Sequence, residues 1–147
     1  MRAVPIVSAL LLACAGACHA ALGGAPEQFG SAATTVAAEV SSAGANYQVR
    51  DTLLPTGTQV REYVSAGGLV FAVTWEGPLL PDLKALLGKY FDAMVAESAS
   101  APRAGRSRLR VNSPEVVIDS GGRMRAFEGS AWIPAQLPAG LGPDELR

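Results

Sequence analysis

Apolar and polar residues begin to alternate regularly at Asn46, after a long stretch without a clear pattern. Residues 46–53 show the period of two that is typical of a half-buried strand. Glycine-containing turns separate this segment from two further strand-like segments, residues 58–65 and 69–75. The third segment is apolar on both of its faces, as is typical of a central strand. The pattern therefore predicts a three-strand antiparallel meander.

A helical period follows the meander. Pro81 and Asp82 suit the first turn of a helix. The backbone N–H groups there have no partner within the helix, so proline loses no hydrogen bond, and an acid is favoured near the positive end of the helix dipole. The apolar residues after them recur at offsets 0, 3, 4, 7, 8, 11 and 12: Leu83, Leu86, Leu87, Tyr90, Phe91, Met94 and Val95. This one-sided stripe predicts an amphipathic helix. Gly88 is expected inside it, at a cost of about 1 kcal/mol relative to alanine, where it allows close packing.

Strand character returns after a linker at residues 98–107. The segments concerned are residues 109–111, 115–119, 123–127 and 131–133, with a turn expected at 120–122. The predicted fold class is α+β: an antiparallel sheet made of the three-strand meander, one amphipathic helix and two to three further strands. The helix is expected to pack on one face of this sheet.

The predicted domain is a single α+β unit over residues 46–133. Residues 21–45 are rich in alanine, glycine and serine, so we expect a flexible leader there, with a short helix near residues 32–40. Residues 134–147 contain three prolines and two glycines, and we expect an irregular C-terminal tail.

The first 20 residues have the features of a secretory signal peptide. Arg2 precedes an apolar run over residues 3–17, and small residues precede a cleavage site expected after Ala20. The run is shorter than the roughly 20 residues that span a bilayer as a helix. We therefore expect an exported protein, periplasmic or secreted, with no transmembrane segment after signal removal. The alternative is a lipoprotein anchored at Cys14, after a lipobox-like sequence, or at Cys18.

Signal removal changes the available chemistry, because both cysteines and the only histidine lie within the first 19 residues. The mature chain would contain no disulfide, thiol nucleophile or histidine, so we predict no catalytic residue, no metal site and no cofactor. Without Arg2, 11 basic residues stand against 13 acidic ones, a net charge of −2. This balance argues against a general nucleic-acid binder.

Residues 103–125 carry the one marked charge asymmetry, with six arginines against two acids, a net charge of +4. Arg108 and Arg110 are two residues apart and would project from the same side of a strand, as would Arg123 and Arg125. Guanidinium groups gathered on one sheet face suit phosphate or carboxylate, so the sequence predicts an anion site at these four residues. Lipid phosphates, envelope glycans or acidic proteins are the exported targets that would fit. The simpler interpretation is a solvated strand face that keeps a sheet edge soluble.

A catalytic alternative rests on carboxylates. Glycosidase chemistry needs two acids roughly 5–10 Å apart across a cleft, and Asp51, Glu62 and Glu76 fall in the first three predicted strands. Cross-strand ion pairs with the neighbouring Arg50 and Arg61 explain the first two acids at least as well. A small carboxylate-dependent hydrolase of envelope polymers therefore stays open as an alternative.

Each tryptophan falls late in a strand pattern. Trp75 shares a face with Phe71, so we expect it in the core. Trp132 can be assigned either to the core or to an exposed surface that would stack on a sugar ring.

The combined motifs resemble a proteobacterial family of small secreted proteins, catalogued as domain of unknown function 2844. They are Ala21 to Gly24, Arg61 to Val64, Val70 to Val73 with Trp75, Gly77 and Pro78, Pro81 to Leu83, Leu87 and Gly88 with Tyr90 and Phe91, and Ser120 to Phe127 with Gly129, Ala131, Trp132 and Pro134. The resemblance implies an exported bacterial protein and brings no activity, ligand or catalytic residue with it. We expect a non-catalytic binding or envelope-accessory module, whose partner is unknown but suits an anionic envelope component.

Overall fold

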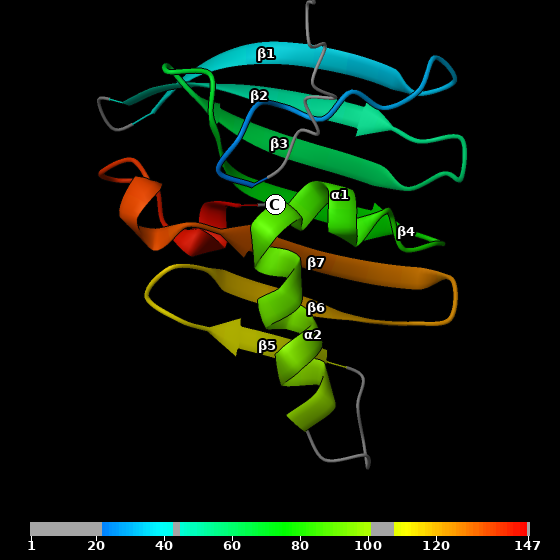
Figure 1. The fold of residues 1–147 in the computed structure, drawn as a ribbon. Coiled ribbons are helices and arrows are strands. Elements are labelled where there is room, and N and C mark those ends of the chain that lie inside the picture. The colour runs from blue at the N-terminus through cyan, green and yellow to red at the C-terminus, as the bar shows by residue number, and fades with distance from the viewer. Residues whose placement is uncertain (1–21, 43–44, 101–107, 147) are drawn as a thin grey trace, which may run out of the picture.

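The described part of the computed structural model, residues 22–42, 45–100 and 108–146, forms one seven-stranded antiparallel sheet (Figure 1). The strands are β1 (Thr34–Ser42), β2 (Ala45–Leu53), β3 (Gln59–Ser65), β4 (Val70–Gly77), β5 (Arg108–Asn112), β6 (Val117–Arg123) and β7 (Ala126–Trp132). Their order across the sheet is β1-β2-β3-β4-β7-β6-β5. Helical segments are α1 (Leu83–Leu87), η1 (Gly88–Tyr90), α2 (Phe91–Ser100), η2 (Pro134–Gln136) and η3 (Pro143–Glu145). The α+β class is confirmed, but the strand count is higher than predicted.

The additional strand is β1, so the helix predicted near residues 32–40 is wrong. β1 pairs with β2 over nine residues, from Thr34 opposite Leu53 to Ser42 opposite Ala45. The β-branched residues of β1 favour this extended backbone. Alanine and serine occupy most of its other positions and hide the alternation that would have identified a strand. The sheet therefore begins within the residues assigned to a flexible leader.

The predicted helix forms as two pieces rather than one. Asp82 caps α1 as expected, because its carboxylate accepts a hydrogen bond of 3.0 Å from the Ala85 amide. Gly88 then ends α1 with a φ of +52°, a backbone conformation that glycine adopts at little cost. The apolar stripe is consequently buried only around this break, at Leu86, Leu87 and Tyr90. In α2 no side chain is fully buried.

The turn predicted at residues 120–122 is also wrong, because these residues lie within β6. The β6–β7 hairpin turns instead at Met124 and Arg125, and Arg125 has a φ of 65°. Gly122 allows the backbones of β6 and β7 to approach closely. A Cβ at this position would collide with the Ala126 carbonyl oxygen and stand 2.6 Å from the Phe127 Cα. A turn at Arg125 is not predictable from residue type, since arginine is uncommon in the left-handed region.

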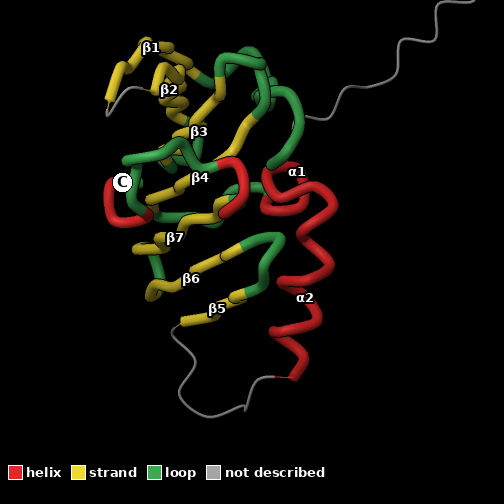
Figure 2. Tube along the Cα trace, turned by 90° about the vertical axis from the view of Figure 1, so that its left-hand side faces the viewer, coloured by secondary structure: helices red, strands yellow, loops and turns green. Residues whose placement is uncertain are grey.

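Two hydrophobic cores lie on opposite faces of the sheet. The larger one is covered by α1, η1, α2 and the N-terminal segment, and the smaller one by the C-terminal segment (Figure 2). Leu22 is buried in the first core, and its amide donates to the Leu86 carbonyl oxygen at 2.9 Å. Leu141 and Leu146 are buried in the second, beside the ring cluster of Tyr47, Tyr63 and Phe71. The segment predicted as an irregular tail therefore acts as a second layer on the sheet.

Glu62 of β3 is a buried charge that fixes the N-terminal segment to the sheet. Its side chain faces the α1 side, between the buried Val60 and Val64, and the residue is 2% exposed. The Glu27 amide donates to Glu62 Oε1 at 2.7 Å, and Arg50 Nη1 lies 3.6 Å from Glu62 Oε2. Burial raises the pKa of the Glu62 carboxyl, and the Glu27 hydrogen bond and the Arg50 charge lower it by less.

We expect replacement of Gly129 by alanine to destabilise the fold. Gly129 is opposite Trp75, and a Cβ there would collide with the Trp75 ring and stand 2.8 Å from the Asp119 carbonyl oxygen. Neither the buried Trp75 ring nor the Asp119 backbone can move away without disturbing the core. Gly129→Ala should therefore cost roughly 1–3 kcal/mol in unfolding free energy. Denaturant titration measures this cost. Gly142→Ala is the matched control, since Gly142 has a φ of −82° and open space around it. Equal stability of the two variants would contradict this packing.

The raised pKa of Glu62 predicts a specific pH dependence of stability. The folded state holds this proton more tightly than the unfolded state, so the contribution is full below the unfolded pKa and is lost as pH rises through the folded one. Glu62→Gln removes the titration and should flatten the fall in unfolding free energy between mildly acidic and neutral pH. Denaturant titrations across this range test it, with Glu97→Gln on the exposed face of α2 as control. A wild-type slope in Glu62→Gln would show that groups other than Glu62 set the dependence.

Candidate functional site

An open groove of about 760 Å³ lies on the face of the sheet opposite α1 and α2. It runs across β3, β4, β7, β6 and β5, and η3 of the C-terminal segment forms one wall. We call it the polar groove. Its charged residues are Arg61, Glu76, Arg108, Arg110, Asp119, Glu128 and Asp144, and Gln59, Thr74, Ser130 and Trp132 also line it. Sheet alternation gathers these side chains, because directly opposite residues share a face.

Asp119 organises the β5 end of the polar groove. Arg110 is directly opposite it, and Arg108 is two residues further along the same side of β5. Arg108 Nε lies 2.8 Å from Asp119 Oδ1 and Arg110 Nε 3.6 Å from Asp119 Oδ2, so one carboxylate bridges two guanidinium groups. Arg108 Nη2 also lies 3.9 Å from Glu128 Oε1. The hydrogen bond to Asp119 raises the pKa of the Arg108 guanidinium.

A second ion pair closes the β3 side. Arg61 Nε lies 2.6 Å from Asp51 Oδ1, and its Nη2 donates to Oδ2 at 3.3 Å. The two residues are direct partners between β2 and β3, which gives the bidentate geometry that a guanidinium prefers. This contact raises the pKa of Arg61. The alternative interpretation of Asp51 as an ion-pair residue is therefore the one that the geometry supports.

Two carboxylates are placed directly opposite each other in the middle of the groove. Glu76 of β4 and Glu128 of β7 are register partners on the same face, and both are exposed. Like charges in this position destabilise a strand pair. Only a fold that pairs β4 with β7 brings these two residues together, so the sequence did not reveal them. Since this placement costs stability, it is the feature of the site that most calls for a functional reason.

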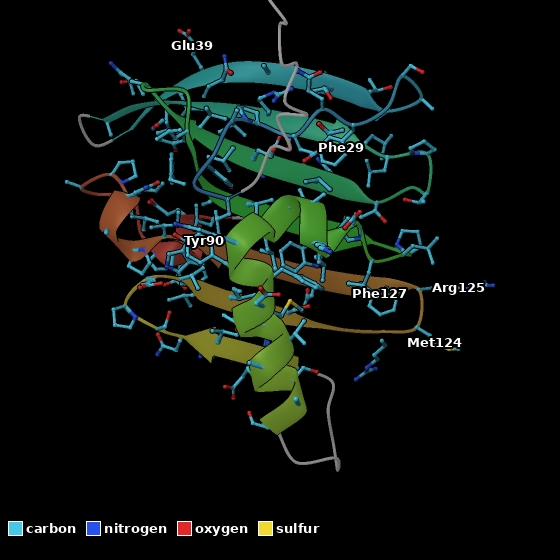
Figure 3. The ribbon with its side chains drawn as sticks, viewed as in Figure 1. Phe29, Glu39, Tyr90, Met124, Arg125 and Phe127 are labelled. Atoms are coloured by element: carbon cyan, nitrogen blue, oxygen red, sulfur yellow. The ribbon has the colours of Figure 1, made fainter. Side chains whose placement is uncertain are left out.

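The structure divides the four predicted arginines into two pairs. Arg108 and Arg110 line the polar groove, whereas Arg123 and Arg125 do not. Arg123 ends β6 and Arg125 lies in the hairpin turn, where its side chain points away from the sheet, like that of Met124 (Figure 3). The separation follows from the position of the turn, which lies at residues 124–125 and not at the predicted residues 120–122. A single four-arginine cluster therefore does not form.

The three acids considered for catalysis do not converge either. Asp51 is held by Arg61, Glu62 is buried on the α1 side, and only Glu76 lines the polar groove. The two tryptophans separate in the same way: Trp75 is 2% exposed in the larger core, as predicted, and Trp132 is half-buried at the groove. Among the described residues, no group of three His, Cys, Asp or Glu side chains could hold a metal ion.

The charges of the polar groove nearly balance. Three arginines stand against four acids, Asp144 included, for a net charge of −1. Both arginines at its β5 end are already paired with Asp119. The groove thus offers alternating hydrogen-bond donors and acceptors rather than a basin of one sign.

Comparison with known proteins yields one match. The family model described as a protein of unknown function (DUF2844) matches residues 18–146, which include every strand and helix described above. No curated protein and no solved structure matches the chain. No helix among the described residues has the length and apolar character needed to cross a membrane. Since the match spans most of the chain, as the sequence motifs indicated, the protein belongs to the DUF2844 family.

Proposed function

We propose that this protein is an exported, non-catalytic binding module and that the polar groove is its ligand site. Export rests on the signal-like residues 1–20, which lie outside the described residues. The observation that carries the binding site is the Arg108–Asp119–Arg110 bridge on an open sheet face. The bridge holds two guanidinium groups in place before a ligand arrives, and such preorganisation lowers the cost of binding.

The chemistry of the groove favours a hydroxyl-rich ligand, such as an envelope glycan. A hydroxyl both donates and accepts, so it can bond to a guanidinium N–H and to a neighbouring carboxylate oxygen. A bare phosphate would meet Asp119, Glu76 and Glu128 as well as the arginines, and these carboxylates would repel it. Trp132 supplies an aromatic surface at the groove wall, which suits a sugar ring. An anionic glycan remains compatible if its charge lies near the β5 end.

The division of the arginines into two pairs provides a matched test. We expect Arg108→Gln with Arg110→Gln to weaken binding to purified envelope polysaccharide tenfold or more, since charge-assisted hydrogen bonds are lost. Arg123→Gln with Arg125→Asn removes the same charge outside the groove and should leave binding nearly unchanged. Asparagine is used at position 125 because it tolerates the left-handed backbone. Co-sedimentation with insoluble polysaccharide measures both.

The outcomes of this experiment separate three interpretations. Loss of binding in the groove variant alone supports the proposal. An equal loss of polysaccharide binding in both variants would show that the overall positive charge drives binding, as the predicted four-arginine anion site requires. Wild-type binding in both variants overturns the polar groove as the ligand site. Denaturation midpoints of both variants show whether either change acts through unfolding.

A second candidate function, hydrolysis of an envelope polymer, is favoured by one observation, the opposition of Glu76 and Glu128. Direct cross-strand partners have Cβ atoms about 5 Å apart, so the carboxyl groups of two such glutamates can reach the separation of roughly 5–10 Å that glycosidases use. It ranks second because both acids are exposed, whereas a general acid needs a shielded carboxyl. The buried carboxyl with a raised pKa, Glu62, lies on the other side of the sheet.

Under the binding proposal, the Glu76–Glu128 opposition costs stability and has no catalytic role. Glu76→Gln should therefore raise the unfolding free energy by about 0.2–1 kcal/mol, through relief of like-charge repulsion. Denaturant titration measures this, and Glu97→Gln serves as a control away from the groove. Release of reducing ends from envelope polysaccharide by the wild type, abolished in Glu76→Gln, would favour the hydrolase instead.

A further inference from the structure

The two edges of the sheet differ sharply in how they are protected. β5, at one edge, has five residues, carries Arg108 and Arg110, and packs beside α2 (Figure 1). Short length, cationic side chains and a covering helix are the means by which natural sheets avoid pairing with foreign strands. The β5 edge uses the first two of them, and α2 packs on its face (Figure 2).

The β1 edge uses none of them. β1 has nine residues, pairs with β2 in an uninterrupted register and contains no proline, lysine or arginine. Its side chains from Thr34 to Glu39 are exposed, and Val36 is 64% exposed. Glu39 is its only charged residue, and that side chain points away from the sheet (Figure 3). No described element lies beyond β1, so its outer backbone groups face outward over a long, regular edge.

We propose that the β1 edge binds the β1 edge of a second copy of this chain, so that two sheets join in one antiparallel dimer. The strand is self-complementary about Ala38. A two-fold axis through Ala38 pairs all nine residues, places Val36 opposite Val40 of the other copy and places Glu39 opposite Ala37. Apolar residues then meet apolar residues, and the single acid meets a methyl group.

Symmetry leaves few other registers. Directly opposite residues must share a face of the joined sheet, so the axis passes through a residue and not between two. An axis through Glu39 would place two carboxylates directly opposite each other, which is unfavourable. An axis through Ala37 pairs fewer residues of the strand. The Ala38 register is therefore the one that the sequence of β1 favours.

The charge content of β1 also argues for a copy of itself over a foreign strand. A foreign partner selected by charge would need complementary charges along the strand, and β1 offers one carboxylate in nine residues. The interface is a single strand pair, so we expect a dissociation constant in the micromolar range or weaker, as for small interfaces. The dimer leaves the polar groove uncovered, because the groove extends from β3 to β5 and does not reach β1.

Cysteine substitution tests the register directly. Paired residues on a two-fold axis have Cα atoms about 4.5–5.5 Å apart, within the range that a disulfide spans. Mild oxidation of the processed protein carrying Ala38→Cys should therefore give a disulfide-linked dimer in high yield. Ala37→Cys is the matched control, because this residue would lie diagonal to its own copy, and its yield should be several-fold lower. Processed wild-type protein, which is expected to contain no cysteine, should give no cross-linked dimer.

Sedimentation velocity from micromolar to several hundred micromolar protein tests the association itself. Val36→Lys should weaken the dimer at least tenfold, since it places an ammonium group against Val40 of the other copy. Leu79→Lys, at a similarly exposed apolar residue between β4 and α1, should associate like the wild type. Glu39→Gln should bind two- to threefold more tightly, because the two Glu39 residues are diagonal neighbours with Cα atoms about 7–8 Å apart, and their like charges repel.

Each outcome supports or overturns the proposal. A wild type that stays monomeric throughout the concentration range overturns it. A dimer that Val36→Lys leaves intact overturns the β1 edge as its interface, and equal cross-linking at positions 37 and 38 overturns the register. Circular dichroism and the thermal midpoint of Val36→Lys exclude loss of fold. Glycan binding by a monomer would leave the proposed function intact while this inference fails.

Discussion

The pairing of β4 with β7 is the contact on which the rest of the structure depends. It joins the meander of β1 to β4 to the strands that follow the helix, across about fifty residues of chain. It places Trp75 over Gly129 on one face and Glu76 opposite Glu128 on the other. Both the larger core and the polar groove are completed by this strand pair. Its loss would leave two smaller sheets, neither with a complete site.

The sheet separates two kinds of polar chemistry. On the α1 side Glu62 is shielded and holds a structural contact with the N-terminal segment, so its raised pKa belongs to the core. On the opposite side the arginines are accessible to solvent and paired with carboxylates. A catalytic site needs a shielded carboxyl facing its substrate, and here shielding and access lie on different faces. This separation is the main physical reason to favour binding over catalysis.

The elements that could be predicted are those whose own residues show which side is buried or where a helix begins. The alternation from Asn46 onward, the apolar third strand and the Asp82 cap follow from local chemistry and are present in the structure. β1 was missed because exposed alanine and serine give an edge strand no apolar face. The turn was misplaced because Gly121 and Gly122 suggested one, whereas Arg125 adopts the left-handed conformation. The groove depended on long-range register, so its residue types were foreseeable but the Glu76–Glu128 opposition and the division of the arginines were not.

The two interpretations of Arg108 and Arg110 need not compete. As edge residues they protect β5 from foreign strands, and as partners of Asp119 they supply the oriented donors of the polar groove. One pair of side chains thus explains why β5 is a protected edge and why the binding chemistry lies beside it. β1 contains no arginine or lysine that could protect it in this way. The formal net charge of the chain is only −1, so charge repulsion does little to prevent unselective pairing at an unprotected edge. The self-complementary register about Ala38 gives the edge a defined partner, and a closed two-fold contact ends the pairing at two copies.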